Sequence, residues 1–437
     1  MTTDETPWVS RFTPLLNRER IRELVELRPQ TILNIGDMSP QEACERVKDA
    51  FQRVYYPSAQ CLDILLQWVR IALAHSLKMY ETSRMFVEGV YQRESPLPEF
   101  SFPWCLTGLA GTGKSALLSA FERLMPKPDT VTAADGTKFP LVSYRAVTVR
   151  ASSTSRDILM QFARREGSTR VLSDYLRRLA YSDGWALVLQ DEFQFATQSA
   201  RASTRVTQMI LAMCYIGVPA VYIANYSLLH KLNERNQEDR HRLLGKVVEL
   251  YPDNCKSKDY RTLLSWFREI APEIFTYDPE GDAEAIDILT AGIKRPLVSL
   301  MEIGFAMAFS KGGVVDYSVL EKAYKSREYA TFRNDVEALA KLYGAFRKSH
   351  KDLWCPIDAV LNSDEDLDLE RDRQSLVDMK AMKASMTVEE RKAYAEVSTR
   401  PEATSTKSGE VKLASKRTKK ADAEQLRENH SWFSDKL

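Results

Sequence analysis

The stretch from Trp104 to Phe121, WCLTGLAGTGKSALLSAF, constrains the fold of this chain more than any other. It carries the pattern G-x-x-x-x-G-K-S between an apolar run and an amphipathic run. Glycines in such a loop let successive backbone N–H groups turn inward and form a cradle for phosphate oxygens. The apolar run predicts a buried strand, and the amphipathic run predicts a helix whose N-terminus faces the anion. The stretch therefore predicts a P-loop.

Each part of this loop has its own expected role. Lys114 places a cation on the β- and γ-phosphates, and the hydroxyl of Ser115 ligates Mg²⁺. ATP and Mg²⁺ are therefore the expected cofactors. The residues predicted to bind the nucleotide in the loop are Gly108, Gly111, Thr112, Gly113, Lys114 and Ser115.

A second strand pattern, WALVLQ, ends in an Asp–Glu pair downstream of the loop. At the carboxyl end of a buried strand, Asp191 is placed to hold Mg²⁺ and Glu192 to polarise the attacking water. Gln190 stands where an apolar residue is usual. Its side chain either faces the edge of the next strand, which we favour, or joins the site.

The next strand pattern, PAVYIAN, ends at Asn225. This amide is placed to hydrogen-bond the γ-phosphate or the water, or alternatively to cap the helix that follows. Arg240 and Arg242 precede another short strand, and one of them is a candidate arginine finger for a neighbouring subunit. Lys294 and Arg295 stand at a predicted helix start, where they either close on the nucleotide or form a solvated helix end.

The chain has a recognisable organisation around these motifs. Its first part is mostly helical and reads as a small bundle packed against the next domain. Short apolar runs, each expected to be one strand and among them LVSYRAVTVR, then alternate with helical patterns, which predicts a parallel sheet with helices on both faces. After about Lys383 the chain is rich in Ser, Thr and Lys, so we expect disorder there. The expected divisions are a helical region at 1–95, an αβα ATPase core at 96–275, a helical lid at 276–345 and a C-terminal region at 346–437.

Composition excludes several classes of protein. The net charge is +1, so any surface for nucleic acid must be local rather than general. Six scattered cysteines without a CxxC pair and five dispersed histidines indicate reduced thiols and no metal cluster. No apolar window is long enough to span a membrane and the N-terminus is polar, so a cytoplasmic protein is expected. The basic cluster at 416–420 is either a solvated tail or a contact for nucleic acid or an acidic partner. The Trp432–Phe433 pair is either without a special role or a short docking motif.

The order of P-loop, Asp–Glu pair, asparagine, arginines and helical lid resembles the AAA+ ATPases. Within them, the stretch from DEFQF to IGVPAVYIAN is similar to the TnsC/TniB/MuB group of transposition regulators. Gln194 and the IGVP at Ile216–Pro219 are its more specific elements. The segment that begins YYPSAQ is similar to the one preceding the P-loop in longer TnsC proteins. The resemblance covers about residues 55–330.

The resemblance implies an AAA+ core with a lid, and an ATPase that forms a ring or filament on duplex DNA without reading sequence. It implies two further partners, a target-selection protein at the N-terminal region and transposase subunits at the C-terminal region. In this group DNA contacts come from the segment after the second strand and from nearby helices. The DNA-contact candidates here are Arg150, Ser152, Thr154, Arg156, Arg177 and Arg178.

Two other functions share most of these motifs. A helicase loader would use the same site with a different partner. A nucleotide-gated scaffold that does not hydrolyse ATP is a third possibility, although the presence of Glu192 argues against it.

Overall fold

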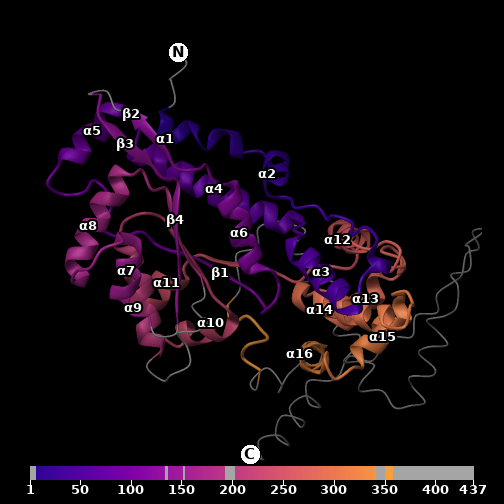
Figure 1. Ribbon diagram of the computed structural model, residues 1–437. Coiled ribbons are helices and arrows are strands. Elements are labelled where there is room, and N and C mark those ends of the chain that lie inside the picture. Colours follow the sequence, from indigo (N-terminus) through magenta and orange to yellow (C-terminus); the bar gives the residue numbers. More distant parts are fainter. Residues whose placement is uncertain (1–5, 133–135, 151–152, 192–201, 341–349, 358–437) are drawn as a thin grey trace, which may run out of the picture. The chain divides into compact units, whose positions relative to one another are not determined.

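The computed structural model describes residues 6–132, 136–150, 153–191, 202–340 and 350–357. Figure 1 shows the order of the elements along the chain. The strands are β1 (Trp104–Thr107), β2 (Asp129–Thr132), β3 (Lys138–Leu141), β4 (Tyr144–Thr148), β5 (Leu187–Asp191), β6 (Ala220–Ile223) and β7 (Val247–Glu249). The helices before the lid are α1 (Pro7–Ser10), α2 (Arg18–Val25), α3 (Pro40–Arg53), α4 (Ala59–Met79), α5 (Ser83–Tyr91), α6 (Lys114–Leu124), α7 (Ser155–Ala163), α8 (Thr169–Ser182), α9 (Ala202–Cys214), α10 (Tyr226–Asn233), α11 (Gln237–Leu244) and α12 (Lys258–Glu269). The lid helices are α13 (Ala283–Thr290), α14 (Lys294–Phe309), α15 (Tyr317–Tyr324) and α16 (Ala330–Ala340).

Five parallel strands form the central sheet in the order β4-β5-β6-β1-β7. β1 lies between β6 and β7, with Leu106 opposite both Ile223 and Val248. Because the strands are parallel, their carboxyl ends share one edge of the sheet, and ligands of such sheets bind beyond that edge. The expected αβα parallel sheet is confirmed, and the P-loop follows its β1 strand.

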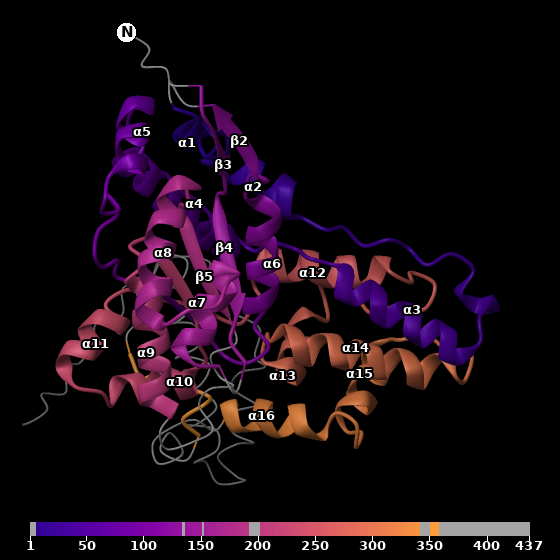
Figure 2. The ribbon, with the colours of Figure 1, turned by 60° about the vertical axis from the view of Figure 1, so that its left-hand side comes forward.

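Helices cover both faces of this sheet (Figures 1 and 2). Side chains alternate along β5, so Leu187 and Leu189 join a cluster with α2, α4 and α6, while Val188 joins another with α7, α8 and α9. Strands buried on both faces read as continuous apolar runs, which is why WALVL was legible as a strand. Gln190 lies on the face of Val188 and is fully buried, without a hydrogen-bond partner among the described residues.

The sequence between α6 and α7 folds differently from its prediction. The run LVSYRAVTVR predicted one strand, but Leu141 ends β3 and β4 begins only at Tyr144. β2 and β3 form an antiparallel hairpin that the sequence analysis missed. Only Val131 and Leu141 of its strand residues are buried, so the alternation of apolar and polar residues is too short to indicate a strand. The Asp135–Gly136 pair was the one available turn signal.

The N-terminal helices pack against two parts of the molecule, and among them α4 contacts both α1 and α2. α2 and α4 pack beneath the sheet with α6, whereas α3 packs on α14 of the lid. The ring of Phe51 on α3 meets Phe267 edge-on at 4.9 Å and Phe275 at 5.8 Å. One N-terminal segment therefore contacts both the sheet with its helices and the lid.

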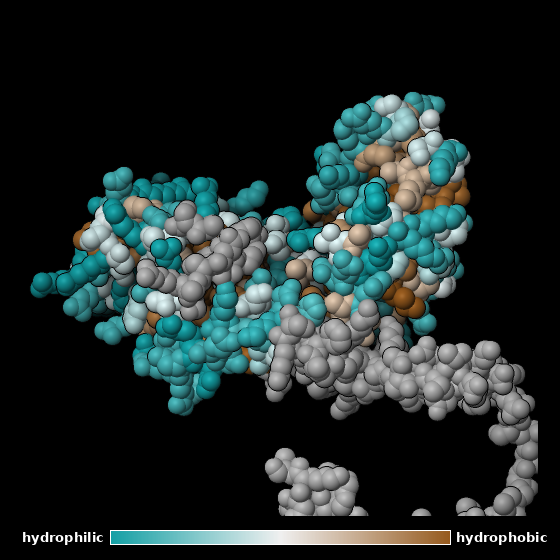
Figure 3. Space-filling model, turned by 90° about the horizontal axis from the view of Figure 1, so that it is seen from below, coloured by the Kyte–Doolittle hydropathy of each residue, from teal (hydrophilic) through white to brown (hydrophobic). Residues whose placement is uncertain are grey.

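The face of the molecule seen from below is largely polar (Figure 3). Seen from below, hydrophilic residues dominate and apolar ones gather only in small patches (Figure 3). Among the helices that the structure describes, none is both long and apolar enough to cross a membrane.

Candidate nucleotide site

The P-loop has a backbone that only glycine adopts readily. Gly108, Gly111 and Gly113 have φ values of +148°, +88° and +104°. A side chain at Gly108 would also place its Cβ 2.4 Å from the carbonyl oxygen of Leu250. The loop therefore holds an open, glycine-lined turn against β7 and its continuation, as a phosphate cradle requires.

Helix α6 begins directly at this loop. Its N-cap is Gly113, which provides no side-chain hydrogen bond to the first turn. The first N–H groups of a helix have no acceptor within the helix, so an uncapped N-terminus favours an anion. Ser115 is exposed in this first turn. The residues present thus fit a phosphate group with a Mg²⁺ beside it.

Lys114 is held inside the loop. Its ammonium donates to the carbonyl of Gly108 at 2.8 Å and to that of Leu109 at 2.6 Å. Burial lowers the pKa of Lys114 to about 8; the charge of Arg295 acts in the same direction and that of Asp191 opposes it. Lys114, Asp191 and Arg295 therefore interact electrostatically although they come from three distant segments.

The acidic half of the site is described only in part. Asp191 ends β5, is buried, and pairs in register with Thr148 of β4. Its carboxylate lies at the same edge of the sheet as the P-loop, and hard oxygen ligands of this kind suit Mg²⁺. Glu192, the predicted general base, and Gln194 lie outside the described residues.

Asn225 follows β6, which ends two residues earlier than predicted, at Ile223. Its side-chain oxygen accepts the N–H of Leu228 at 3.0 Å and caps α10. The capping alternative is thus what the structure describes. The cap uses only the amide oxygen, so the NH₂ group is the part that suits a phosphate oxygen.

A glutamate that the sequence pattern did not single out contacts the residue after this asparagine. Glu249 ends β7, pairs in register with Thr107, and accepts a hydrogen bond from the hydroxyl of Tyr226. Its negative charge raises the pKa of Lys114 against the effect of burial. The available signal was an acid at the end of the apolar run VVE, the same pattern that identified Asp191.

The lid reaches the P-loop through the start of α14. The backbone N–H of Arg295 donates to the carbonyl of Gly111 at 3.1 Å, and its side chain is exposed. Lys294 lies instead 3.3 Å from the carboxylate of Asp253. Burial, the largest single influence, would lower the pKa of Lys294, but Asp253 together with Cys61 and Asp259 outweighs it and the pKa is raised. The ammonium of Lys294 is therefore held by the protein, which leaves Arg295 as the lid cation for a nucleotide.

Both finger candidates lie on α11. Arg242 pairs with Glu238 at 2.7 Å and covers the ring of Phe100 at 5.7 Å. Arg240 lies on the same helix and is partly exposed. Since α11 leads into the start of β7, it lies at the amino edge of the sheet, away from the P-loop. Neither arginine is therefore placed to serve the nucleotide of its own chain.

A C-terminal arm, residues 350–357, packs against the elements of the site. Leu353 and Cys355 pack on Leu109 of the P-loop, on Tyr226 beside Asn225, and on Ile293 at the lid. Trp354 meets the ring of His230 edge-on at 4.4 Å. The arm joins core and lid, and nothing in the sequence pattern indicated it.

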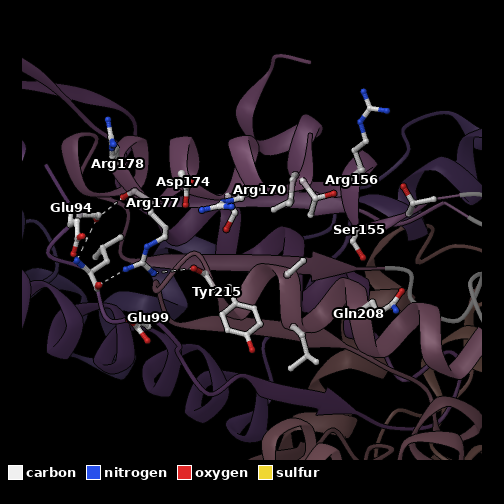
Figure 4. Close-up of a pocket in the computed structure, with 18 of the residues that line it drawn as sticks. Glu94, Glu99, Ser155, Arg156, Arg170, Asp174, Arg177, Arg178, Gln208 and Tyr215 are labelled. Carbon is white, nitrogen blue, oxygen red and sulfur yellow. Dashed lines mark hydrogen bonds between the residues drawn. The ribbon is translucent and has the colours of Figure 1, made fainter. Parts of the chain in front are cut away.

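Four of the DNA-contact candidates line one groove, which we call the arginine groove (Figure 4). Its volume is about 1300 Å³. Helix α8 lies along one side and α9 along the other, with the start of α7 at one end and the segment after α5 at the other. The four candidates are Thr154, Arg156, Arg177 and Arg178.

Not all of these candidates are available for a ligand. The guanidinium of Arg177 donates to the carbonyls of Leu97, Pro98 and Tyr215 at 2.6–3.0 Å, so its role is to fix the segment before β1. Thr154 caps α7 in a capping box. Arg150, Arg156 and Arg178 are exposed, although Arg156 also donates to Gly167. Ser152 lies outside the described residues.

Comparison with known proteins shows similarity only at the level of structure. No family model and no curated protein matches the sequence. The chain is similar to Cdc6p from Pyrobaculum aerophilum, with 15% identity over 74% of this chain and 89% of that chain and a TM-score of 0.38. It is similar to the Aeropyrum pernix Orc1 protein, solved in complex with DNA, with 15% identity, coverages of 77% and 87% and a TM-score of 0.37. It is also similar to domain III of the replication initiation protein DnaA from Thermotoga maritima, with 17% identity over 56% of this chain and 89% of that chain and a TM-score of 0.31.

The fold class follows from the strand order and the arrangement of the site. A P-loop follows β1 within a five-stranded parallel sheet, an asparagine follows the adjacent β6, and a helical lid contacts the loop. This is the fold class of an AAA+ P-loop core with a lid.

Proposed function

We propose that this chain is an ATP-dependent, DNA-binding AAA+ ATPase that links target-site selection to a transposase. The observation that carries the nucleotide half is the convergence of Lys114, Asp191 and Arg295 at one edge of the sheet. The transposition half rests on the resemblance of residues 55–330 to the TnsC/TniB/MuB group.

The residues of the site divide the chemistry among them. The loop N–H groups and Lys114 bind the phosphates, and Arg295 covers them from the lid. Ser115 and Asp191 would hold Mg²⁺, which neutralises phosphate charge when bound. Glu192 accepts the proton of the attacking water, and the NH₂ group of Asn225 orients that water or the γ-phosphate.

Hydrolysis in this scheme needs a second copy of the chain. Arg240 and Arg242 lie at the amino edge of the sheet, so each suits the γ-phosphate held by a neighbour rather than its own. A ring or filament, in which every site meets the next subunit's α11, satisfies this requirement.

DNA contact is expected from exposed cations at the carboxyl edge of β4 and along the arginine groove. Arg150, Arg156 and Arg178 would neutralise backbone phosphates, which position a protein without reading sequence. With a net charge of +1, one monomer binds DNA weakly. An ATP-assembled oligomer aligns several copies, so binding should need ATP and fall steeply with salt.

The test has two arms. Filter binding to unrelated duplexes at about 50–200 mM salt should show ATP-dependent, sequence-indifferent affinity that falls by orders of magnitude. A transposase encoded beside this chain should co-purify with it only in ATP. Binding of a replicative helicase in its place would favour the loader alternative. Tight, salt-insensitive DNA binding without ATP would contradict the proposed mechanism.

A further inference from the structure

The arginine groove is lined by more exposed arginines than the two, Arg156 and Arg178, that are proposed to contact DNA. Five exposed arginines line it, and three acidic side chains, those of Glu94, Glu99 and Asp174, also line it. In Figure 4, Glu94 and Glu99 lie near Arg177 while Arg156 lies at the opposite end. The exposed arginines are Arg93, Arg156, Arg170, Arg178 and Arg205.

Apolar side chains also line this groove. Leu211 and Ala212 of α9 are partly exposed there, whereas Leu97 and Leu159 are only 3% and 1% exposed. Tyr215 adds an aromatic ring that is 43% exposed. The phosphates of a DNA backbone have no use for such a surface, whereas a peptide that mixes carboxylates with aliphatic side chains fits both the partly exposed apolar side chains and the arginines.

The chain itself contains such a peptide. Residues 364–370 read DEDLDLE, five carboxylates and two leucines without a basic residue. We call this segment the acidic run. In an extended peptide, alternating residues point to opposite sides, so the pattern separates Leu367 and Leu369 from the acids between and beside them.

The acidic run is within reach of the groove. The last described residue, Ile357, belongs to the arm, whose Trp354 lies against α10, and α10 packs on α9. Seven residues from Ile357 to Asp364 span up to about 23 Å. A helix with its side chains is about 10–12 Å across, so α10 and α9 together are about 20–24 Å wide, which an extended tether of this length matches.

We propose that the acidic run binds in the arginine groove, with its carboxylates on Arg156, Arg170 and Arg178 and its leucines on the apolar side chains. Single exposed ion pairs are weak, but several act together here and the short tether makes binding intramolecular. Where DNA contacts Arg156 and Arg178, the run competes with it. This competition with DNA rests on the proposed function, whereas the binding of the acidic run in the groove does not depend on it.

The test uses the full chain without nucleotide or DNA, so that its failure is distinct from a failure of the proposed function. A photoreactive benzoylphenylalanine replaces Leu367, and cross-links are mapped by mass spectrometry. We expect cross-links to α8 and α9. The same label at Leu413, which lies in the basic part of the tail, should give several-fold fewer of them.

Charge exchange makes the test specific. Asp366→Lys with Asp368→Lys should remove the groove cross-links, and so should Arg170→Glu with Arg178→Glu. The four changes together should restore them. Cross-links that map elsewhere, or that do not respond to these charges, would overturn the proposal.

Arginine modification gives an independent readout. In the Asp366→Lys, Asp368→Lys variant, phenylglyoxal should modify Arg170 and Arg178 several-fold faster than in the wild type, while the exposed Arg268 of α12 reacts at the same rate in both. Should duplex DNA protect these arginines while the variant leaves their reactivity unchanged, the groove is a nucleic-acid site and the acidic run is not its ligand.

Discussion

The backbone N–H of Arg295 donates a hydrogen bond to the carbonyl of Gly111 across 3.1 Å. This bond joins the first turn of a lid helix to the middle of the P-loop. The approach is close because Gly111 has no side chain; an added Cβ would lie 2.8 Å from the Cβ of Arg295. The position of the lid and the shape of the phosphate cradle are therefore coupled directly.

This closeness predicts the effect of Gly111→Ala. Forcing a methyl group into a packed contact costs about 1–3 kcal/mol, which here separates lid from loop and should weaken ATP binding by about tenfold or more. Gly136→Ala is the matched control, since Gly136 also has a positive φ, +84°, but no atom within 4 Å of the added Cβ. Equilibrium titration of ATP separates the two. Equal affinities in both variants would mean that the lid contact does not support the nucleotide.

Lys114→Ala should abolish ATP binding, because the loop has no second lysine to meet the β- and γ-phosphates. Equilibrium titration with ATP measures the loss. A wild-type affinity in this variant would show that the cradle is assigned wrongly.

The lowered pKa of Lys114 predicts a pH dependence. Only the protonated amine attracts phosphate, and its pKa in the free protein is about 8. Affinity for ATP should be nearly constant below pH 7 and fall above pH 8, by up to about tenfold per pH unit. Lys114→Arg keeps its charge over this range and should show no such fall, whatever its absolute affinity. Parallel slopes for the two proteins from pH 7 to 9 would exclude Lys114 as the titrating group.

Glu192→Gln should separate binding from turnover. The amide leaves Asp191 in place but does not accept a proton from water, so hydrolysis should fall by about 10²-fold or more while ATP still binds. If hydrolysis is the disassembly signal, DNA-bound oligomers of this variant should persist after free ATP is removed. Electron microscopy over time follows them. Release as fast as in the wild type would remove Glu192 from regulation and leave it a role only in turnover.

Trp354→Ala should loosen the C-terminal arm, because Trp354 provides its ring contact to His230. Alkylation of Cys355 should then accelerate several-fold, whereas Cys44, the other partly buried thiol, reports any general loosening. Lys351→Ala removes only an exposed ion pair with Glu234 and should change little. Peptide mass spectrometry gives the rates. An unchanged rate at Cys355 would show that Trp354 does not hold the arm.

Sequence patterns that span only a few neighbouring residues were sufficient to predict the main strands and the P-loop of the core. The P-loop was legible because its glycines, lysine and serine are adjacent in the chain, and their backbone needs no distant residue to be recognised. The strand ending at Asp191 was legible because a parallel strand buried on both faces leaves a continuous apolar run. Glu249 ends a similar run and could have been identified by the same argument.

Relationships between distant segments were decided only by tertiary structure. No periodicity in residues 40–53 indicates that α3 packs on the lid while α4 packs beneath the sheet, because an amphipathic helix shows that it has an apolar face and not what covers it. In the sequence Arg177 looks like an ordinary surface cation. In the fold, three carbonyl groups from other segments lie within hydrogen-bond distance of its guanidinium. The contact of Arg295 with Gly111 likewise exists only because the fold brings the lid to the loop. A sequence records which side chains are apolar, charged or absent, whereas their partners are set by the free energy of packing the whole chain.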